Sequence, residues 1–401
     1  MRRRVAVTGM GVVSPVGNDV ESFRDALLAG RSGAGPITLF DPASLPTRIA
    51  AEVKWTGPIF RDRKISFALA AAEQAFGSAT RGGSGPHGRG GASLGIGLEL
   101  FSMEDAVADP PLPDALEDRL TFLQTPSDLC VHLISKRYGL SAPPVTHVSA
   151  CAAGTDAIGS AFRMIADGRR DWMIAGGTDS MINPLGVGGF CKIRAMTVRN
   201  AEPARASRPF DRGRDGFLLG EGAGILVLEA LDDARARGAA IRAEVAGYGN
   251  SFDAHGISEP HPEGRGALQA MTRALEDAGL SPERIDCVNA HGTSTPKNDP
   301  VETAALRRLL GARAKEVPVC ATKSMIGHLI SAAGAVEAIA AIACMEAGRV
   351  HPTINLDDPD PACDLDYVPD RARPHRHECV LSNSFGFGGQ NASIVLKAAD
   401  A

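Results

Sequence analysis

Strand-like and helix-like patterns of apolar residues alternate along the chain. Residues 5–11 (VAVTGMG) form a short apolar run that predicts a strand, and residues 21–30 place apolar side chains at helical spacing. The same order recurs at 144–150 and 152–168, and residues 171–178 predict another strand. This alternation is typical of an α/β fold with largely parallel strands.

The second half of the chain repeats the alternation. It has predicted strands at 241–249, 285–292, 317–324 and 378–384, and predicted helices at 264–279, 298–311 and 331–348. The two halves also open alike, since VAVTGMG at 5–11 is similar to EVAGYGN at 244–250. We therefore predict a duplicated α/β unit, with one half at residues 1–238 and the other at 239–401.

The composition excludes several classes of protein. Hydrophobic residues make up 44% of the chain and charged residues 22%, which is typical of a soluble globular protein. Glycine and threonine interrupt the first apolar run too early for a secretory signal, and no apolar run approaches the ~20 residues that span a bilayer. The net charge of -5 gives no general attraction for nucleic acid or anionic lipid. We expect a cytoplasmic protein with no nucleic-acid or membrane partner.

Cysteine spacing indicates free thiols. The eight cysteines stand at 130, 151, 191, 287, 320, 344, 363 and 379. None of them forms CxxC, so reduced thiols are favoured over disulfides or a metal site. The glycine-rich segments do not match the dinucleotide or P-loop patterns, so no NAD or ATP site is predicted.

Cys151 stands where a predicted strand turns into a predicted helix. A thiol at a helix N-terminus meets the positive end of the helix dipole, which is expected to lower its pKa. The small residues that follow, Ala152, Ala153 and Gly154, leave room beside the sulfur. Before this context is considered, a buried structural cysteine is the more common interpretation.

Two histidines and a lysine follow predicted strands of the second half. His291 ends one strand, at a sheet edge where open α/β folds bind ligands, and Lys323 and His328 precede the helix at 331–348. Taken alone, a histidine at a strand end such as His291 is more often an ordinary loop residue, and the alternative for Lys323 and His328 is a basic loop at a helix start. A lysine beside a histidine is nevertheless more typical of a shared site than of a solvated surface.

The C-terminal segment NSFGFGGQN surrounds Phe387 with glycines. Glycines permit positive φ and close backbone approach, which would let a peptide N–H point into a site. A simple glycine-rich turn is the alternative.

Four sequence blocks together resemble the β-ketoacyl-acyl carrier protein synthases. These are SACAAG around Cys151, NAHGTSTPKNDPVE after His291, TKSMIGH with Lys323 and His328, and NSFGFGGQN with Phe387. The segments VTGMGVVSPVGND, PLGVGGF and SRPFDRGRDGFLLGEGAG are similar to the same family, in particular to its chain-elongating members. The resemblance covers nearly the whole chain.

The resemblance implies a thiolase-like fold. In that fold two duplicated halves, each with a mixed five-stranded sheet, stack as α/β/α/β/α layers with the active site between them. It also implies a homodimer, with a heterodimer as the alternative.

The resemblance further implies a decarboxylative Claisen condensation in fatty acid or polyketide synthesis. Cys151 would carry the acyl group, while His291 and His328 would stabilise the enolate formed from malonyl-acyl carrier protein. Phe387 would supply an oxyanion N–H and gate the acyl pocket, and Glu337 would support Lys323. Substrates would arrive on the phosphopantetheine of the carrier protein, with no separate cofactor.

Carrier docking and chain length are less well defined by the sequence. Arg63, Lys64, Lys192 and Arg194 are candidates to bind the acidic carrier protein, although solvated surface charge explains each of them too. Residues 98–107 (LELFSMEDAV) fill the stretch that shapes the acyl pocket in relatives, so the preferred chain length is not predicted.

Two alternatives remain at this point. A thiolase would need a second cysteine near the C-terminus, but Cys379 precedes a predicted strand and lies outside the glycine-rich block. A catalytically silent partner subunit of a heterodimer would typically lack the nucleophile, whereas this chain has Cys151 and both histidines.

Overall fold

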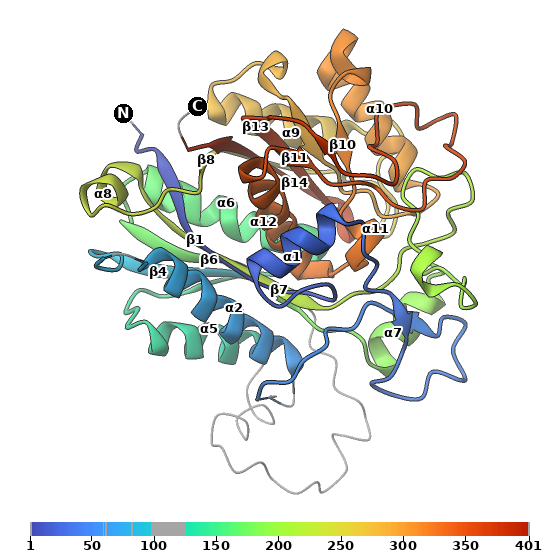
Figure 1. Cartoon of the computed structure of the whole chain (residues 1–401), viewed down its shortest axis with the longest axis horizontal. Coiled ribbons are helices and arrows are strands. Elements are labelled where there is room, and N and C mark those ends of the chain that lie inside the picture. Colours follow the sequence, from blue (N-terminus) through green and yellow to red (C-terminus); the bar gives the residue numbers. More distant parts are fainter. Residues whose placement is uncertain (1, 59, 61, 82, 98–125, 400–401) are drawn as a thin grey trace, which may run out of the picture.

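The structure is a computed structural model that describes residues 2–58, 60, 62–81, 83–97 and 126–399 (Figure 1). The first half contains β1 (Val5–Val13), α1 (Val20–Leu28), β2 (Gly35–Pro36), β3 (Ile49–Ala50), α2 (Arg63–Ala79), β4 (Gly90–Ile96), α5 (Pro126–Arg137), β5 (Val145–His147), α6 (Ala153–Ala166), β6 (Trp172–Asp179), α7 (Pro184–Lys192), β7 (Gly222–Ala230) and α8 (Leu231–Ala236). The second half contains β8 (Ala243–Phe252), α9 (Arg265–Ala278), β9 (Cys287–Asn289), α10 (Asn298–Leu310), β10 (Val319–Cys320), α11 (Lys323–Ile326), α12 (Ala333–Glu346), β11 (Arg349–Val350), β12 (Arg373–Pro374), β13 (Cys379–Gly386) and β14 (Gln390–Ala398).

Within the described residues, each half contributes five strands to one large sheet, in the same spatial order. The first half runs β1-β7-β6-β4-β5 and the second runs β8-β14-β13-β9-β10. In both halves the first two pairings are antiparallel and the other two are parallel. The halves join where Val5–Val7 pairs with Ala243–Val245. The repeated order confirms the predicted α/β class with mixed five-stranded sheets.

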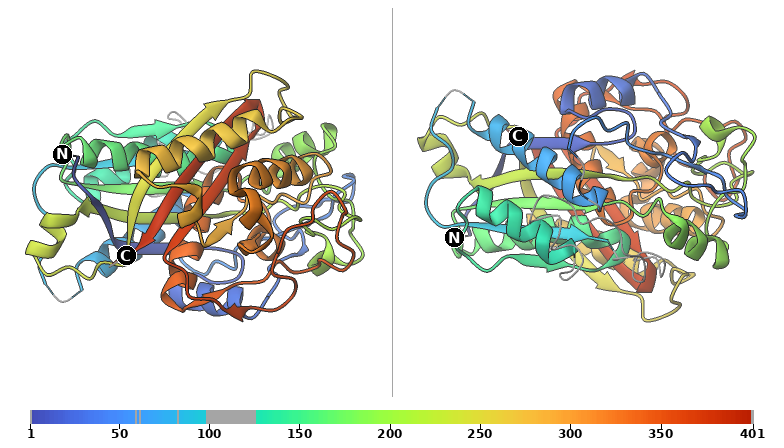
Figure 2. Two further views of the ribbon diagram at one scale, coloured as in Figure 1. Left: turned by 90° about the horizontal axis from the view of Figure 1, so that it is seen from above. Right: turned by 90° about the horizontal axis from the view of Figure 1, so that it is seen from below.

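The elements stack as α/β/α/β/α layers (Figures 1 and 2). Helices α2 and α5 cover the outer face of the first half's sheet, and α9 covers that of the second half. Helices α6 and α12 lie between the two sheets and contact strands of both. Because α12 is surrounded by protein, its residues Ala333–Met345 are all buried, and this explains its almost uniformly apolar sequence.

Small residues let the two central helices approach at their N-terminal ends. A β-carbon at Gly154 of α6 would lie 2.8 Å from the carbonyl oxygen of Ser331, just before α12. A β-carbon at Gly334 of α12 would collide with the side chain of Thr155 on α6. The start of α6, which carries the SACAAG block, is thereby held against the start of α12.

The predicted elements agree with the structure in type but differ in extent. Strands β5 and β10 are shorter than predicted, because the chain leaves each sheet early to form the turns that precede α6 and α11. The long buried strands β7 and β14 have no counterpart among the predicted elements. The stretch at 98–107 lies outside the described residues. Among the helices that are described, none combines the length and the apolar character required to cross a membrane.

Two glycine substitutions test how closely the layers pack. A β-carbon at Gly95 of β4 would collide with the carbonyl group of Ala153 on α6, whereas one at Gly77, on the exposed side of α2, would have no atom within 4 Å. We expect Gly95→Ala to lower the free energy of unfolding by about 1–3 kcal/mol through overpacking. We expect Gly77→Ala, the matched control, to raise it by about 0.5–1 kcal/mol through better helix propensity. Urea denaturation measures both, and equal effects of the two substitutions would contradict the packing described.

Candidate active site

Cys151 lies in the turn between β5 and α6. A 3₁₀ turn at Ala150–Ala152 precedes the helix, and Cys151 is 3% exposed. Ala150 has a φ of 48°, a left-handed conformation that residues with a β-carbon seldom adopt. This sharp turn presents the thiol at the N-terminal end of α6.

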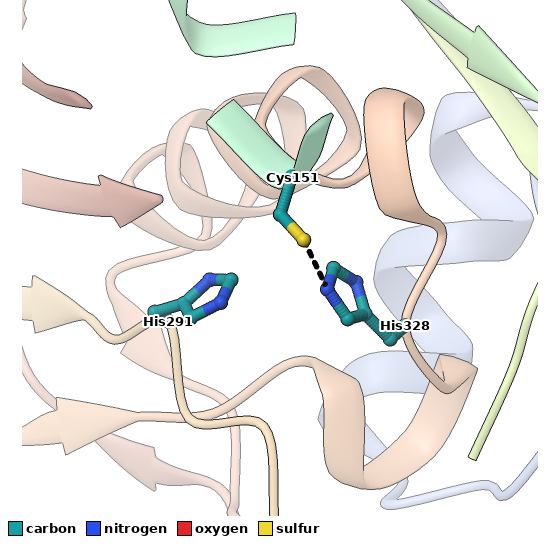
Figure 3. Close-up of side chains that lie close together, drawn as sticks. All are labelled: Cys151, His291 and His328. Atoms are coloured by element: carbon teal, nitrogen blue, oxygen red, sulfur yellow. Dashed lines mark hydrogen bonds between the residues drawn. The ribbon is translucent and has the colours of Figure 1, made fainter. Parts of the chain in front are cut away.

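Both histidines reach the thiol from the second half, as Figure 3 shows. His328 Nε2 is 3.0 Å from Cys151 Sγ, and the rings of His291 and His328 are 5.4 Å apart at an angle of 83°. His291 follows β9, and His328 follows α11. Both side chains are buried. The structure therefore brings together three residues that are far apart in the sequence.

Hydrogen bonds to Nδ1 fix the proton positions of both imidazoles. His291 Nδ1 faces the ammonium of Lys323 at 3.3 Å, and His328 Nδ1 accepts the backbone N–H of Ile330 at 3.2 Å. An ammonium group and a peptide N–H can only donate, so each Nδ1 must accept. In a neutral ring the proton then lies on Nε2, and His328 Nε2 is the atom that lies 3.0 Å from Cys151 Sγ. Both rings can therefore donate a hydrogen bond from Nε2, and His328 donates toward the thiol.

A buried ion pair supports this arrangement. Lys323 Nζ lies 2.5 Å from Glu337 Oε1, and neither side chain is more than 2% exposed. Burial raises the pKa of Glu337 to about 7, although the Lys323 ammonium opposes the shift. Because Glu337 lies on α12, the pair ties the loop that carries Lys323 to the central helix.

The environment keeps both imidazoles neutral. Burial lowers the pKa values of His291 and His328 well below 6.5, and the nearby Lys323 ammonium lowers them further. Neutral rings with fixed Nε2–H groups can stabilise a carbonyl oxygen that gains negative charge.

Backbone N–H groups approach the sulfur from another side. The peptide N–H of Phe387 and that of Cys151 itself both hydrogen-bond to Cys151 Sγ. The approach needs a small residue before Phe387, because a β-carbon at Gly386 would lie 3.1 Å from the nitrogen of Cys151. Two N–H groups that converge in this way have the form of an oxyanion hole.

The pKa of Cys151 differs from the expectation of a lowered value. Burial raises the pKa of this thiol to about 11, and the N–H of Phe387 and the charge of Lys323 offset the shift in part. Removal of the sulfur from water outweighs the favourable effect of the helix terminus. The resting thiol is therefore protonated at neutral pH.

The cluster also has the residue types of a metal site. One ligand atom from each of Cys151, His291 and His328 lies within 4.8 Å of the others. Coordination needs a lone pair on the ring nitrogen that faces the ion, whereas the bonds at Nδ1 place a proton on each Nε2. The arrangement therefore favours donation of hydrogen bonds over metal binding.

Glu302 is a positioning residue that the sequence analysis did not assign. It is fully buried on α10, and its carboxylate accepts the backbone N–H groups of His291 at 2.8 Å and Gly292 at 2.9 Å. Asn383 of β13 donates to the same carboxylate at 3.2 Å. The only feature of the sequence that points to Glu302 is its position eleven residues after His291. An acidic residue there is explained equally well by the start of a helix.

A cavity of about 240 Å³ leads from the surface to Cys151. Phe217, Phe385 and Phe387 line its inner part, while Arg194 and Lys297 line its entrance among other residues. Phe387 is half-buried beside Phe190, with ring centroids 6.3 Å apart. Among the described residues, this channel has an aromatic inner wall, and near its mouth the basic Arg194 and Lys297 lie together with the acidic Glu259, which pairs with Lys297.

Two of the four predicted docking residues are not available to a partner. Arg63 forms a two-pronged ion pair with the buried Glu221, at 2.6 and 3.0 Å, and Lys64 is 1% exposed and pairs with Asp62 at 2.9 Å. The prediction for these two is wrong because both charges are used inside the protein. Lys192 and Arg194, at the end of α7 and just beyond it, are exposed.

Comparisons with known proteins agree with this geometry. Residues 2–234 match the family model described as "Beta-ketoacyl synthase, N-terminal domain", and residues 242–357 match "Beta-ketoacyl synthase, C-terminal domain". A 3-oxoacyl-[acyl-carrier-protein] synthase 2 of Coxiella burnetii is 44% identical, with 98% of each chain covered. A solved type II polyketide synthase acyl-carrier protein in complex with its ketosynthase bound to the hexaketide has a chain that is 34% identical, with a TM-score of 0.91 and all of both chains covered. The ishigamide ketosynthase/chain length factor is 36% identical, with a TM-score of 0.87 over 99% of this chain and 100% of that one.

The assigned proton positions can be observed directly. We expect ¹⁵N-histidine NMR to show His291 and His328 as neutral Nε2–H tautomers from pH 8 down to pH 6, because burial and Lys323 lower both pKa values well below 6.5. Free histidine, which titrates near pH ~6.5, is the reference. A protonation midpoint near that of free histidine for either ring would contradict the assignment.

Proposed function

The chain belongs to the β-ketoacyl synthase family, the condensing enzymes of fatty acid and polyketide synthesis, and we propose that Cys151 is the nucleophile that holds the acyl chain during the reaction. One observation carries this proposal: the buried thiol accepts hydrogen bonds from two backbone N–H groups and lies within 4.8 Å of two imidazoles that are held neutral. A nucleophile and two separate sites for negative charge are what an acyl transfer followed by a decarboxylative condensation requires.

In the first step Cys151 attacks the thioester of an acyl group carried on phosphopantetheine. The oxygen of the tetrahedral intermediate is stabilised by the N–H groups of Cys151 and Phe387. The carrier thiol then leaves with the proton of Cys151, so the acyl-enzyme forms without any net change of charge. The N–H groups offset the high pKa of Cys151 because they also stabilise the sulfur as it becomes negative.

In the second step a malonyl thioester binds with its carbonyl oxygen against His291 and His328. Loss of carbon dioxide leaves an enolate, whose negative oxygen accepts both Nε2–H bonds. The enolate carbon attacks the acyl-Cys151 thioester, and collapse of the intermediate releases a 3-oxoacyl product two carbons longer. Cys151 leaves as a thiolate and takes a proton from solvent. This chemistry needs no further cofactor.

Lys323 and Glu337 act on the orientation and charge of the imidazoles. The Lys323 ammonium holds the proton of His291 on Nε2 and disfavours a second proton on either ring. Glu337 holds the ammonium in place. Phe387, half-buried at the inner wall of the channel, is the proposed gate to the acyl pocket.

The geometry argues against the two alternative functions. A thiolase needs a second cysteine at the site, but Cys379 is at the opposite end of β13 from Phe385 and is not among the described residues that line the cavity. A catalytically silent partner subunit would not need a thiol surrounded by N–H donors, because it does not form an acyl-enzyme. The presence of Cys151 with all four donors supports an active subunit.

An acyl carrier protein is the proposed partner. The carrier is acidic, and the chain has a net charge of -5, so their encounter needs a local basic surface. The proposed docking residues are Arg194, which is exposed and lines the channel, and the exposed Lys192 two positions before it.

A dimer is the second proposed assembly. Strand β5 is at the outer end of the sheet, and Val148, which follows it, is 68% exposed. A second copy of the chain could add its own β5 there as a homodimer, because an edge strand offers unpaired backbone groups. A heterodimer with a related subunit would use the same edge.

The organisation of the chain completes the proposal. We assign the halves to residues 1–238 and 239–401, in support of which the family matches end at 234 and resume at 242. A cytoplasmic location is supported by eight cysteines that are all unpaired, as in proteins of reducing compartments.

Substitutions in the site should separate its two steps. We expect His291→Ala or His328→Ala to slow malonyl decarboxylation about 100-fold through loss of ~3 kcal/mol of enolate stabilisation, while Cys151 is still acylated. Cys151→Gln should abolish condensation and preserve decarboxylation. Mass spectrometry of the acylated protein and release of labelled carbon dioxide measure the two steps.

A matched control is Cys191→Ser, because Cys191 is the least buried of the other cysteines. This variant should be acylated like the parent. Acylation chiefly at Cys191 or Cys320, or decarboxylation at the parental rate in both histidine variants, would contradict the assignments.

A charge reversal tests the docking proposal. We expect Arg194→Glu to raise the KM for carrier-bound substrates several-fold and to leave turnover of small pantetheine thioesters unchanged, because these make no contact with the carrier surface. Added salt should weaken the carrier reaction of the parent more than that of the variant. Arg376→Glu is the control, since this arginine is 89% exposed and does not line the channel. Equal effects of Arg194→Glu on carrier-bound and pantetheine substrates would refute docking.

A further inference from the structure

The turn that carries Cys151 holds a strained backbone. Ala150 has a φ of 48°, and a residue with a β-carbon in this region costs about 1–2 kcal/mol relative to a right-handed conformation. Such a conformation persists where surrounding contacts hold it. On the inner side of the turn these contacts are the bond from Ala152 N–H to the Ser149 carbonyl at 3.0 Å and that from Ser331 Oγ to the Ala150 carbonyl at 3.4 Å.

A second set of contacts holds the turn from its other side. Ser149 Oγ donates to Asp156 Oδ2 at 2.5 Å, and Tyr248 Oη donates to Asp156 Oδ1 at 2.6 Å. Asp156 lies in the first turn of α6, and Tyr248 lies in β8 of the second half. One carboxylate therefore connects the residue two positions before the nucleophile with the opposite half of the protein.

The chain makes specific room for Tyr248. A β-carbon at Gly159 of α6 would collide with the tyrosine ring, so the ring can lie against the helix because this position is glycine. The guanidinium of Arg163 stacks on the same ring at 4.6 Å, and the backbone N–H of Tyr248 donates to Asp277 at 3.1 Å. Tyr248 is 4% exposed. Packing thus fixes the ring, and the ring fixes the direction of its hydroxyl.

We propose that Asp156 and Tyr248 are positioning residues that hold the Ser149–Cys151 turn in its strained, reactive conformation. The proposal rests on the proposed role of Cys151 as nucleophile. Neither side chain lines the cavity that contains the thiol and the imidazoles, so both act through Ser149. Burial raises the pKa of Asp156, and the hydroxyls of Ser149 and Tyr248 offset this shift because they stabilise the carboxylate.

The proposal predicts an effect on one step of the reaction. The imidazoles are held by Lys323, Glu302 and the N–H of Ile330, and none of these contacts passes through Asp156. Loosening the turn should therefore slow attack by Cys151 and leave decarboxylation at the imidazoles unchanged.

The test uses Tyr248→Phe in the full-length protein, because this change removes one hydroxyl and keeps the ring packed on Gly159 and Arg163. We expect single-turnover acylation of Cys151 by an acyl-pantetheine thioester, followed by mass spectrometry, to be about tenfold slower, since a hydrogen bond to a charged group is lost. The concentration of thioester at half-maximal rate should not change. Decarboxylation of malonyl-pantetheine, measured in a Cys151→Gln background, should stay within twofold of its parent. Tyr138→Phe is the control, since Tyr138 packs beside Phe76, with ring centroids 4.6 Å apart, and does not line the cavity.

Ser149→Ala provides an independent variant. It should slow acylation by a similar factor, and the double variant with Tyr248→Phe should lose less than the product of the two effects, because both act through Asp156. Acylation at the parental rate in Tyr248→Phe, an equal loss of decarboxylation, or independent effects of the two substitutions would overturn the proposal. A parent protein in which Cys151 is not acylated at all would instead refute the proposed function.

Discussion

The close contact between α6 and α12 in the middle layer is the constraint on which the site depends. Gly154 and Gly334 let the two helix N-termini pack closely, because the Ser331 carbonyl and the Thr155 side chain occupy the space that a β-carbon at these positions would need. Cys151 stands at the start of α6, and His328 stands in the turn that leads into α12. A larger residue at either glycine would push the thiol away from the imidazole, and the distance of 3.0 Å between Cys151 Sγ and His328 Nε2 would be lost.

Burial changes the pKa values of the groups that meet at this contact. Removal of the site from water raises the pKa of Cys151 and Glu337 and lowers those of both histidines. Without other contacts, the raised pKa would leave almost all of the Cys151 thiol protonated, and a protonated thiol is a poor nucleophile. The N–H groups of Phe387 and Cys151 compensate, because hydrogen bonds to a developing negative charge are stronger where water is excluded. The ion pair of Lys323 and Glu337 is costly to bury, but it determines which nitrogen of His291 carries the proton.

The two halves supply different parts of the chemistry. The first half contributes the thiol and its strained turn, while the second contributes both imidazoles, the lysine and the Phe387 N–H. Since the two sheets have the same strand order, corresponding loops of the two halves carry the proposed nucleophile in the first half and the proposed hydrogen-bond donors in the second. The carboxylate of Asp156, held between Ser149 and Tyr248, is one of the polar links between the halves close to Cys151.

The sequence by itself determined the α/β alternation, the internal repeat and the identities of Cys151, His291, Lys323 and His328, because apolar periodicity and short motifs are local properties of the chain. It did not determine that Arg63 is paired with the buried Glu221, which is distant in the sequence, or that Lys64 is enclosed by the fold beside Asp62. The histidine tautomers, the raised pKa of Cys151 and the role of Glu302 were decided by the tertiary structure. Each depends on burial and on hydrogen-bond partners that only folding brings together, and no pattern along the chain records them.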